Sequence, residues 1–450
     1  MDKLFRRIWR LRGKLVVNFI STRGNQSYGI DQVLAKGIAD DGGLFVPEEL
    51  PHINLEELQG EVSLIDTAKL LLTPYFEEST LKNNLNQIIK ESLFFPIPSI
   101  KAFPDENIWF LELFHGPTAA FKDVGAGFLA SCLSRLNSAE NKPLVVLVAT
   151  SGDTGGAVAA AFHGLPNVKV IVLFPKDKVS KRQEKQLTCW GDNILSLTVN
   201  GTFDDCQALV KNIFVDPVLT SKYRFSSANS INFGRLLPQS IYYAHSSLSH
   251  YGQYGKKTNF IIPTGNLGNG LACLLARSMG FPIGEIVLSV NENRLIVDYL
   301  DGAEWLPKPS IQTLANAMDV GNPSNMERLN SLFGQTDELK GSVSAVSVSD
   351  ENISNEITRV FEQTKTIICP HTATASYAYS LFADEIKKSQ DWFIAATAHP
   401  AKFETIVEPL INQRVAIPNE LAVLLEKPSK TFTINPNIKE FEQIIIDKSI

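Results

Sequence analysis

The stretch of sequence that decides the fold is residues 113–128, which read LFHGPTAAFKDVGAGF. It follows an apolar run that begins at Ile108 and is typical of a strand. Gly116-Pro117 ends this strand, because glycine and proline both favour turns. Thr118 is then expected to cap a helix with one apolar side. The pattern therefore predicts a strand, a tight turn and a helix in succession.

Lys122 is the residue of this helix that could carry chemistry. It lies in the first turns, beside Phe121 and small residues. A lysine among apolar neighbours loses the solvation of its charge, so its pKa falls and its amine becomes a usable nucleophile. From this segment alone, a surface lysine on an amphipathic helix explains the pattern equally well.

The composition is that of an ordinary globular protein. The chain has 450 residues, of which 44% are hydrophobic and 20% charged, so two or three domains are expected. The formal net charge of -6 offers no positive footprint for nucleic acid. No apolar span approaches the length of a transmembrane helix, so no membrane partner is expected.

The cysteines and histidines indicate neither a disulfide framework nor a metal site. No CxxC or HExxH spacing occurs in the sequence. Scattered cysteines of this kind are typical of a reducing compartment, and a cytoplasmic location is therefore expected. The five cysteines are Cys132, Cys189, Cys206, Cys273 and Cys369.

Residues 1–17 form a basic N-terminal stretch that differs from the rest. Its lysines and arginines interrupt the apolar residues, so it does not have the apolar core of a signal peptide. A solvated tail is expected, although a basic amphipathic helix can also lie on a membrane surface. Residues 18–24 resemble a natural beginning, which leaves a start codon assigned too early as a further interpretation.

Residues 18–103 are predicted to form an N-terminal, mainly helical domain. Apolar residues recur at helical spacing from Ile30 to Ile38, and two further helical stretches are expected around residues 64–76 and 81–93. Pro96 and Pro98 then make a plausible boundary with the next unit.

Strands and helices alternate through the remainder of the chain. Short apolar runs, of the kind found in buried parallel strands, lie at residues 144–149, 168–174, 194–199, 260–263 and 286–290. Helical segments are predicted between them, at residues 157–162, 180–188 and 203–213. This alternation predicts two doubly wound α/β domains. We assign residues 104–145 and 246–450 to a large domain and residues 146–245 to a small one.

Three polar loops could bind anions. Residues 265–270, GNLGNG, connect a strand to a helix, and such a loop brings backbone amides and a helix N-terminus to a phosphate. Residues 150–156 and 226–235 are rich in hydroxyls, amides and glycines, and the latter contains Arg235. Taken singly, each is also explained as a structural turn. Together with Lys122, they fit pyridoxal phosphate chemistry, in which a lysine and a glycine loop hold the cofactor.

With these motifs the chain resembles a known family, the threonine synthases. The resemblance covers residues 18 to about 425 and indicates the branch with a long N-terminal domain that needs no S-adenosylmethionine activator. It implies a fold-type II pyridoxal phosphate enzyme, similar to the tryptophan synthase β subunit. The motifs that carry it are residues 113–128, 149–155, 227–235, 263–269, 316–320 and 397–403.

The resemblance implies a lyase that converts O-phospho-L-homoserine and water to L-threonine and phosphate. Lys122 matches the lysine that binds the cofactor as a Schiff base and then serves as the general base. Thr372 matches a hydroxyl placed near the pyridine nitrogen. Asp153 falls where much of the superfamily has an asparagine facing the cofactor's O3′, and an ionised aspartate would repel that phenolate. The cofactor-phosphate loop is matched by Gly265, Asn266, Leu267, Gly268 and Asn269.

Two sets of residues are expected to bind the substrate. The carboxylate loop is matched by Thr150, Ser151 and Thr154, and the substrate phosphate is expected at Ser230, Asn232 and Arg235. Gly268 is expected to need either a positive φ or a close approach to phosphate.

Two other functions are compatible with these features. One is a serine/threonine ammonia-lyase of the same fold, and the other is a non-catalytic relative of threonine synthase. The expected assembly is a monomer or a homodimer, with a small-molecule substrate as the only partner.

Overall fold

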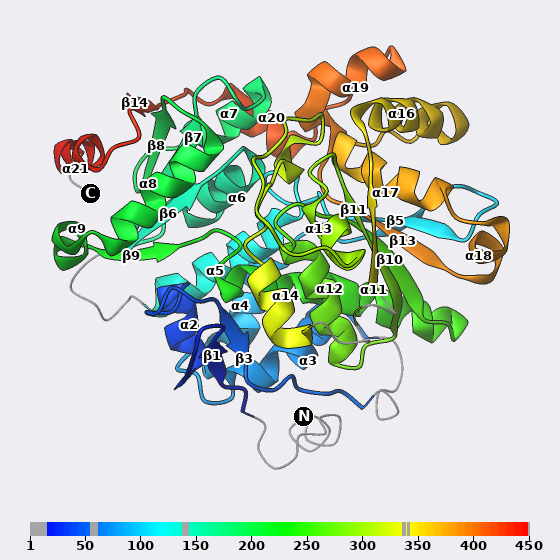
Figure 1. Cartoon of the computed structure of the whole chain (residues 1–450), viewed down its shortest axis with the longest axis horizontal. Coiled ribbons are helices and arrows are strands. Elements are labelled where there is room, and N and C mark those ends of the chain that lie inside the picture. Colours follow the sequence, from blue (N-terminus) through cyan, green and yellow to red (C-terminus); the bar gives the residue numbers. More distant parts are fainter. Residues whose placement is uncertain (1–15, 55–61, 137–143, 335–338, 340–342, 449–450) are drawn as a thin grey trace.

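The described part of the chain forms three β-sheets, two of which are mainly parallel (Figure 1). The computed structural model describes residues 16–54, 62–136, 144–334, 339 and 343–448. Residues 1–15 of the predicted basic tail lie outside the described residues, whereas Val17 is buried in the core.

The larger sheet has six strands, and only β4 runs antiparallel to its neighbour. Its central strands, at residues 258–263 and 392–396, are buried throughout, as expected where helices cover both faces of a sheet. In spatial order they are β12 (Val343–Ser347), β11 (Ile283–Val290), β10 (Thr258–Pro263), β13 (Trp392–Ala396), β5 (Ile108–Glu112) and β4 (Ser99–Lys101).

The second sheet has five strands, all parallel. In spatial order they are β14 (Phe432–Ile434), β8 (Ile194–Val199), β7 (Val168–Pro175), β6 (Leu144–Ala149) and β9 (Arg224–Ser227). The pairing of β14 with β8 differs from the sequence-based assignment, which placed residues 246–450 with the other sheet. The C-terminal strand β14 pairs with the edge of β8 that would otherwise be open, so these residues belong to the smaller sheet.

Helices pack around both sheets, and the strands predicted from apolar runs are found with small changes at their ends. In chain order the α-helices are α2 (Ile30–Lys36), α3 (Leu64–Phe76), α4 (Leu85–Ser92), α5 (Lys122–Leu136), α6 (Asp153–Phe162), α7 (Lys181–Thr188), α8 (Phe203–Val215), α9 (Pro217–Lys222), α10 (Phe233–Leu236), α11 (Ser240–Tyr254), α12 (Gly268–Ser278), α13 (Leu295–Leu300), α14 (Met326–Phe333), α16 (Asp350–Thr364), α17 (Pro370–Ser380), α18 (Asp384–Ser389), α19 (Glu404–Ile411), α20 (Asn419–Glu426) and α21 (Ile438–Asp447). Short 3-10 turns are η2 (Lys82–Asn84), η3 (Leu237–Gln239), η4 (Asn316–Met318) and η5 (Pro400–Phe403).

The N-terminal segment contains a small sheet that the sequence analysis missed. Strands β1 (Phe19–Ser21), β2 (Gly24–Tyr28) and β3 (Phe45–Pro47) pair antiparallel in the order β2-β1-β3. These strands are short, and β2 is polar, so they show no apolar alternation that would reveal them. The helices predicted at residues 64–76 and 81–93 are confirmed as α3 and as η2 followed by α4.

The prediction that Thr118 caps the central helix is wrong. Helix α5 begins at Lys122, and the Thr118 amide instead donates to Oδ2 of Asp123 at 2.9 Å. The chain between them bends sharply, with Ala119 at a φ of 54°. This bend separates Thr118 from the helix and places Lys122 at its first residue.

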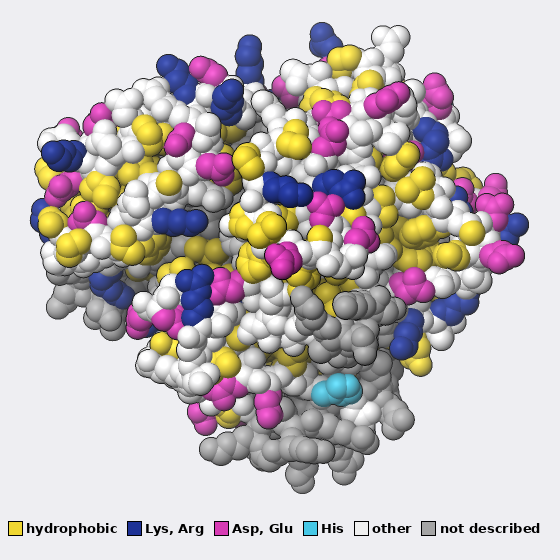
Figure 2. Space-filling model, viewed as in Figure 1, with side chains coloured by type: hydrophobic (Ala, Val, Ile, Leu, Met, Phe, Trp, Pro, Cys, Tyr) yellow, Lys and Arg dark blue, Asp and Glu magenta, His cyan; other side chains and the backbone are white. Residues whose placement is uncertain are grey.

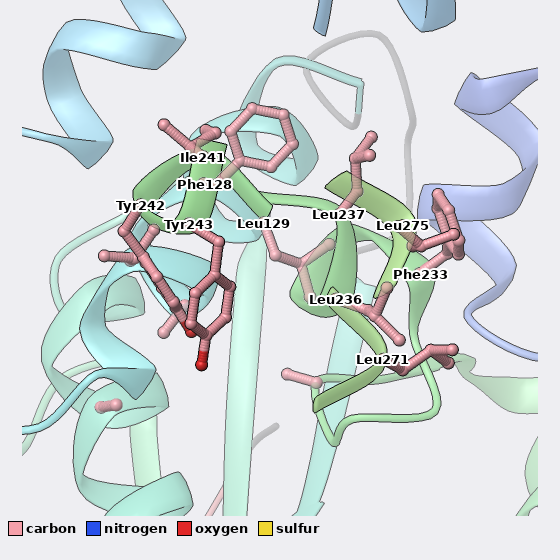
Figure 3. Close-up of a cluster of buried hydrophobic side chains, with 14 of the residues drawn as sticks. Phe128, Leu129, Phe233, Leu236, Leu237, Ile241, Tyr242, Tyr243, Leu271 and Leu275 are labelled. Carbon is pink, nitrogen blue, oxygen red and sulfur yellow. The ribbon is translucent and has the colours of Figure 1, made fainter. Parts of the chain in front are cut away.

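A buried cluster fixes the helices that carry the predicted site (Figure 3). Its side chains come from α5, α10, η3, α11 and α12, and all are fully buried. Burying each of these large apolar side chains contributes about 1.5–3 kcal/mol, so the cluster strongly resists relative motion of these helices. The labelled members are Phe128, Leu129, Phe233, Leu236, Leu237, Ile241, Tyr242, Tyr243, Leu271 and Leu275.

Two structural features are absent among the described residues. No helix there is long and apolar enough to cross a membrane, and no group of His, Cys, Asp or Glu is arranged to hold a metal ion. On the face seen in Figure 2, lysine and arginine side chains are interspersed with aspartate and glutamate. Such mixing of charges gives that face no nucleic-acid footprint.

Candidate active site

A cavity lies where β6, β10 and β13 end, with residues from both large sheets in its wall. Parallel α/β sheets commonly bind ligands at the carboxyl ends of their strands. The cavity brings together most of the predicted site residues, which are Lys122, Thr150, Ser151, Asp153, Thr154, Ser230, Arg235, Gly265, Asn266, Leu267, Gly268 and Asn269.

Lys122 presents its amine to this cavity from the first residue of α5. The pKa of Lys122 is lowered to about 8, mainly by burial; the carboxylate of Asp153 opposes this shift, and the cations of Lys402 and Arg235 add to it. A lysine in this range exists partly as the free amine near neutral pH, which is the form that reacts as a nucleophile or base.

Asp153 is paired with a lysine that the sequence analysis did not single out. Lys402, from η5, is completely buried and its Nζ lies 2.8 Å from Oδ1 of Asp153. Gln183 also donates to this oxygen, at 3.0 Å. Although burial opposes ionisation, Lys402 and then Lys122 hold the pKa of Asp153 well below its usual range. Asp153 is therefore an ionised carboxylate whose charge is balanced inside the protein.

Arg235 is buried with part of its guanidinium unpaired. Its Nη1 donates to the carbonyl of Ala228, while Nε has no hydrogen-bond partner among the described residues. Burial lowers the pKa of Arg235 to about 10, which leaves the side chain charged at neutral pH. A buried charge with an unpaired donor is costly, and an anionic ligand in the cavity would satisfy it.

The prediction that Asn232 binds substrate phosphate is not supported. Asn232 is fully buried, and its side chain caps α10 by accepting from the Gly234 amide at 2.9 Å. Its Nδ2 donates to the carbonyls of Leu34 and Ser227. Both ends of the amide are thus used to hold the backbone, and Asn232 is not among the residues that line the cavity.

The glycine loop ends at the N-terminus of α12, as predicted. Of the two reasons predicted for a glycine at position 268, a positive φ does not apply, because the positive φ of this loop is at Leu267, at 63°. This conformation costs a leucine about 1–2 kcal/mol and is held by the surrounding structure. A Cβ added at Gly268 would lie 3.5 Å from Cβ of Ser230, an ordinary contact. Close approach to a phosphate therefore remains as the reason to expect glycine at position 268.

Asn269, near the start of α12, lines the cavity and has a side-chain donor without a partner among the described residues. Its Oδ1 accepts from the hydroxyls of Tyr242 and Tyr243, at 2.6 and 2.9 Å. These two bonds fix the amide, and its buried Nδ2 has no partner among the described residues. The helix N-terminus adds backbone amides with no acceptor inside the helix. The loop therefore suits a phosphate.

Thr150 shapes the second predicted loop. Its Oγ1 accepts from the amides of Gly152 and Gly155, at 3.0 and 2.9 Å. A hydroxyl can accept twice and still donate once, so the Thr150 proton stays available to a ligand. Ser151 and Thr154 line the same part of the cavity.

On α17 the structure differs from the prediction by one residue. Thr372 is buried, does not line the cavity and has its Oγ1 3.3 Å from Sγ of Cys369. His371 faces the cavity instead, because neighbouring side chains on a helix point about 100° apart. No role was predicted for His371 from the sequence.

His371 is a neutral donor. Its Nε2 accepts from the Ala317 amide at 3.1 Å, which places the ring proton on Nδ1, a buried atom without a partner in the described part of the chain. Burial lowers the pKa of His371 to about 4.

The residues around the cavity fit pyridoxal phosphate. Three buried donors are unpaired, namely Nε of Arg235, Nδ2 of Asn269 and Nδ1 of His371. A ligand with several anionic and acceptor atoms would satisfy them, and Lys122 supplies the amine that such a cofactor requires.

Comparison with protein families gives three matches along the chain. The family described as "Pyridoxal-phosphate dependent enzyme" matches residues 86–397. "Threonine synthase N terminus" matches residues 18–93, and "Threonine synthase, C-terminal" matches residues 372–445. These matches confirm the predicted fold class, a fold-type II pyridoxal phosphate enzyme.

Individual proteins agree with the family matches. The chain is 36% identical over 426 residues to threonine synthase of Buchnera aphidicola, covering 94% of this chain and 98% of that protein. The crystal structure of threonine synthase from Escherichia coli superposes with a TM-score of 0.87 and 34% identity, over 96% of this chain and all of that one. The structure of PLP-bound threonine synthase from Brucella melitensis gives the same TM-score at 29% identity, over 96% of this chain and 99% of that one. The chain belongs to the threonine synthase family of pyridoxal-phosphate-dependent enzymes.

Proposed function

We propose that this chain converts O-phospho-L-homoserine and water to L-threonine and phosphate, the last step of threonine biosynthesis. The observation that carries this proposal is one lysine in a cavity whose wall also holds two sets of anion donors. The glycine loop with Asn269 forms one set, and Arg235 with Ser230 belongs to the other. A cofactor phosphate and a substrate phosphate would need two such sets.

Lys122, the loop 265–269 and the Nδ2 of Asn269 would hold pyridoxal phosphate, the lysine by a covalent bond. When bound, this cofactor withdraws electrons from the substrate and so acidifies its carbon-bound protons. Ser230 would steady the loop, since its Oγ accepts from Nδ2 of Asn266 at 2.7 Å. The neutral Nδ1–H of His371, another residue that lines the cavity, supplies a further donor.

Lys122 would also move protons at the substrate. Its lowered pKa means that the amine is available to take the Cα proton and later to return a proton to the product. The same residue thus anchors the cofactor and acts as the catalytic base.

The substrate would be oriented from both ends. The free hydroxyl proton of Thr150, with Ser151 and Thr154, would bind the carboxylate. Arg235 and Ser230 would bind the phosphate that leaves from Cγ. A charged guanidinium is suited to this position, because charge grows on the phosphate as its bond to Cγ breaks.

The proposal is tested by incubating the purified, cofactor-loaded protein with O-phospho-L-homoserine. We expect threonine and inorganic phosphate in equal amounts. A serine/threonine ammonia-lyase would instead release ammonia from threonine or serine, and a non-catalytic relative would release nothing. Either result, without phosphate release from phosphohomoserine, would contradict the proposal.

We also propose a cytoplasmic location and an assembly no larger than a homodimer. The location is supported by the five cysteines, which all lie buried as free thiols. Light scattering of the purified protein measures the assembly, and a mass above that of two chains would contradict this part.

A further inference from the structure

Lys402 is a second lysine close to the cavity that holds Lys122. Its position is unusual because a lysine is rarely buried completely. It is completely buried, and its Nζ contacts Oδ1 of Asp153 and donates to the carbonyl of Thr118, both at 2.8 Å. Asp153 lines the cavity together with Lys122. Lys402 is not among the residues that line the cavity, so it pairs with Asp153 from the protein interior behind the cavity wall.

Four ionisable groups from four elements surround the amine of Lys122. They are Asp153 on α6, Arg235 on α10, His371 on α17 and Lys402 on η5. His371 is neutral near pH 7, so one carboxylate and two cations remain. In a dry cavity, opposite charges attract much more strongly than in water.

The question is which cation the carboxylate holds. If Asp153 paired with Lys122, it would stabilise the ammonium form and remove the free amine. The described residues contain the pair between Lys402 and Asp153, and no ion pair between Lys122 and Asp153. The contact to Thr118 ties Lys402 to the bend that precedes Lys122, so the pair is also fixed relative to α5.

We propose that Lys402 is a positioning residue. Its ion pair with the Asp153 carboxylate keeps that carboxylate from pairing with Lys122, and so leaves Lys122 as a free amine. The pair also presents no net charge to the cavity, so the carboxylate does not repel an anionic ligand. The inference rests on the proposed role of Lys122 but concerns a different residue and a different property.

The test measures the amine of Lys122 directly, in the full-length protein freed of cofactor. The rate of reductive methylation of Lys122 with formaldehyde and cyanoborohydride is followed against pH by peptide mass spectrometry. Only the free amine reacts, so the midpoint reports its ionisation. The proteins compared are the parent, Lys402→Met, Asp153→Asn and the double variant.

Lys402→Met should raise the midpoint of Lys122, because it releases the carboxylate and removes a repelling cation. A rise of about one unit would slow methylation about tenfold at a fixed pH below both midpoints. Asp153→Asn should lower the midpoint, and the double variant should return most of the way to the parent. Such rescue by a second substitution is not expected if Lys402 only fills space.

Arg359→Met is the matched control. Arg359 pairs with the buried carboxylate of Glu356 at 2.7 Å, away from the cavity. Its loss should lower the melting temperature without moving the midpoint of Lys122. If Lys402→Met behaves in the same way, the proposal is wrong and Lys402 is a structural residue.

If Lys402→Met fails to fold, the double variant, which combines Lys402→Met with Asp153→Asn, tests the proposal instead. A folded double variant with a parent-like midpoint would support the proposal, and an unfolded or shifted one would contradict it. The role of Lys122 itself is judged separately, by mapping the bound cofactor, so the two failures can be told apart.

Discussion

Arg235 combines complete burial, a positive charge and an unpaired Nε, and substitution should reveal its role. Arg235→Met should lower kcat/KM for phosphohomoserine roughly 30- to 150-fold, because a charge-assisted contact is worth about 2–3 kcal/mol. Steady-state kinetics give this value. Arg235→Lys is the control that keeps the charge but loses the planar fork. A kcat/KM within about threefold of the parent, with only the melting temperature lowered, would make Arg235 structural.

The pKa of Lys122, near 8, predicts how cofactor capture depends on pH. The pKa is lowered from its ordinary value by burial, so the free amine appears as pH rises through 8 rather than through the usual range of lysine. The rate at which the cofactor-free protein captures pyridoxal phosphate should rise with pH and level off above this value. Stopped-flow absorbance follows the reaction. A rate that keeps rising toward pH 10 would mean that the pKa is not lowered.

At the scale of elements, the glycine loop offers a pair of matched substitutions. A Cβ added at Gly265 would come within 2.7 Å of the Met318 backbone, whereas one at Gly268 would make ordinary contacts. Gly265→Ala should therefore destabilise the cofactor-free protein by about 1–3 kcal/mol. Gly268→Ala should leave that stability unchanged and weaken only cofactor binding.

Denaturation and cofactor titration of the two variants separate these effects. Unchanged affinity for pyridoxal phosphate in Gly268→Ala would show that the loop approaches no phosphate at this position. Equal loss of stability in both variants would show that packing, rather than a ligand, requires both glycines.

Some elements were visible in the sequence and others were not. Residues 144–149 are a continuous apolar run, and buried parallel strands leave that pattern. Strand β2 is polar and short, so its pairing in a sheet follows from tertiary contacts that local sequence does not encode.

The candidate site shows the same division. Lys122 and the glycine loop were recognisable because a local motif carries each. The pair between Asp153 and Lys402 joins residues far apart in the chain, and only folding brings them together. Whether Thr372 or its neighbour His371 faces the cavity depends on how helix α17 is rotated about its axis, and residue spacing does not determine this rotation.

At the scale of the molecule, the two large sheets share the cavity, and the C-terminal residues complete the smaller sheet. Ile434, Phe441 and Ile445 pack in one core with Leu197 and Leu209. Removing the chain after residue 428 should therefore expose the edge of β8. Hydrogen exchange should become faster in β8 and α8, while β12 in the other sheet stays protected. Faster exchange in β12 alone would contradict this assignment of the C-terminal residues.

The central claim is that Lys122 is the residue that binds the cofactor. The most direct measurement is borohydride reduction of the pyridoxal phosphate-loaded protein, followed by peptide mass spectrometry to locate the modified lysine. If Lys122 binds the cofactor, we expect the modification at Lys122 in the parent protein and no modification in Lys122→Ala. Modification at Lys402, which lies behind the cavity wall, or at any other lysine of the parent protein would contradict it.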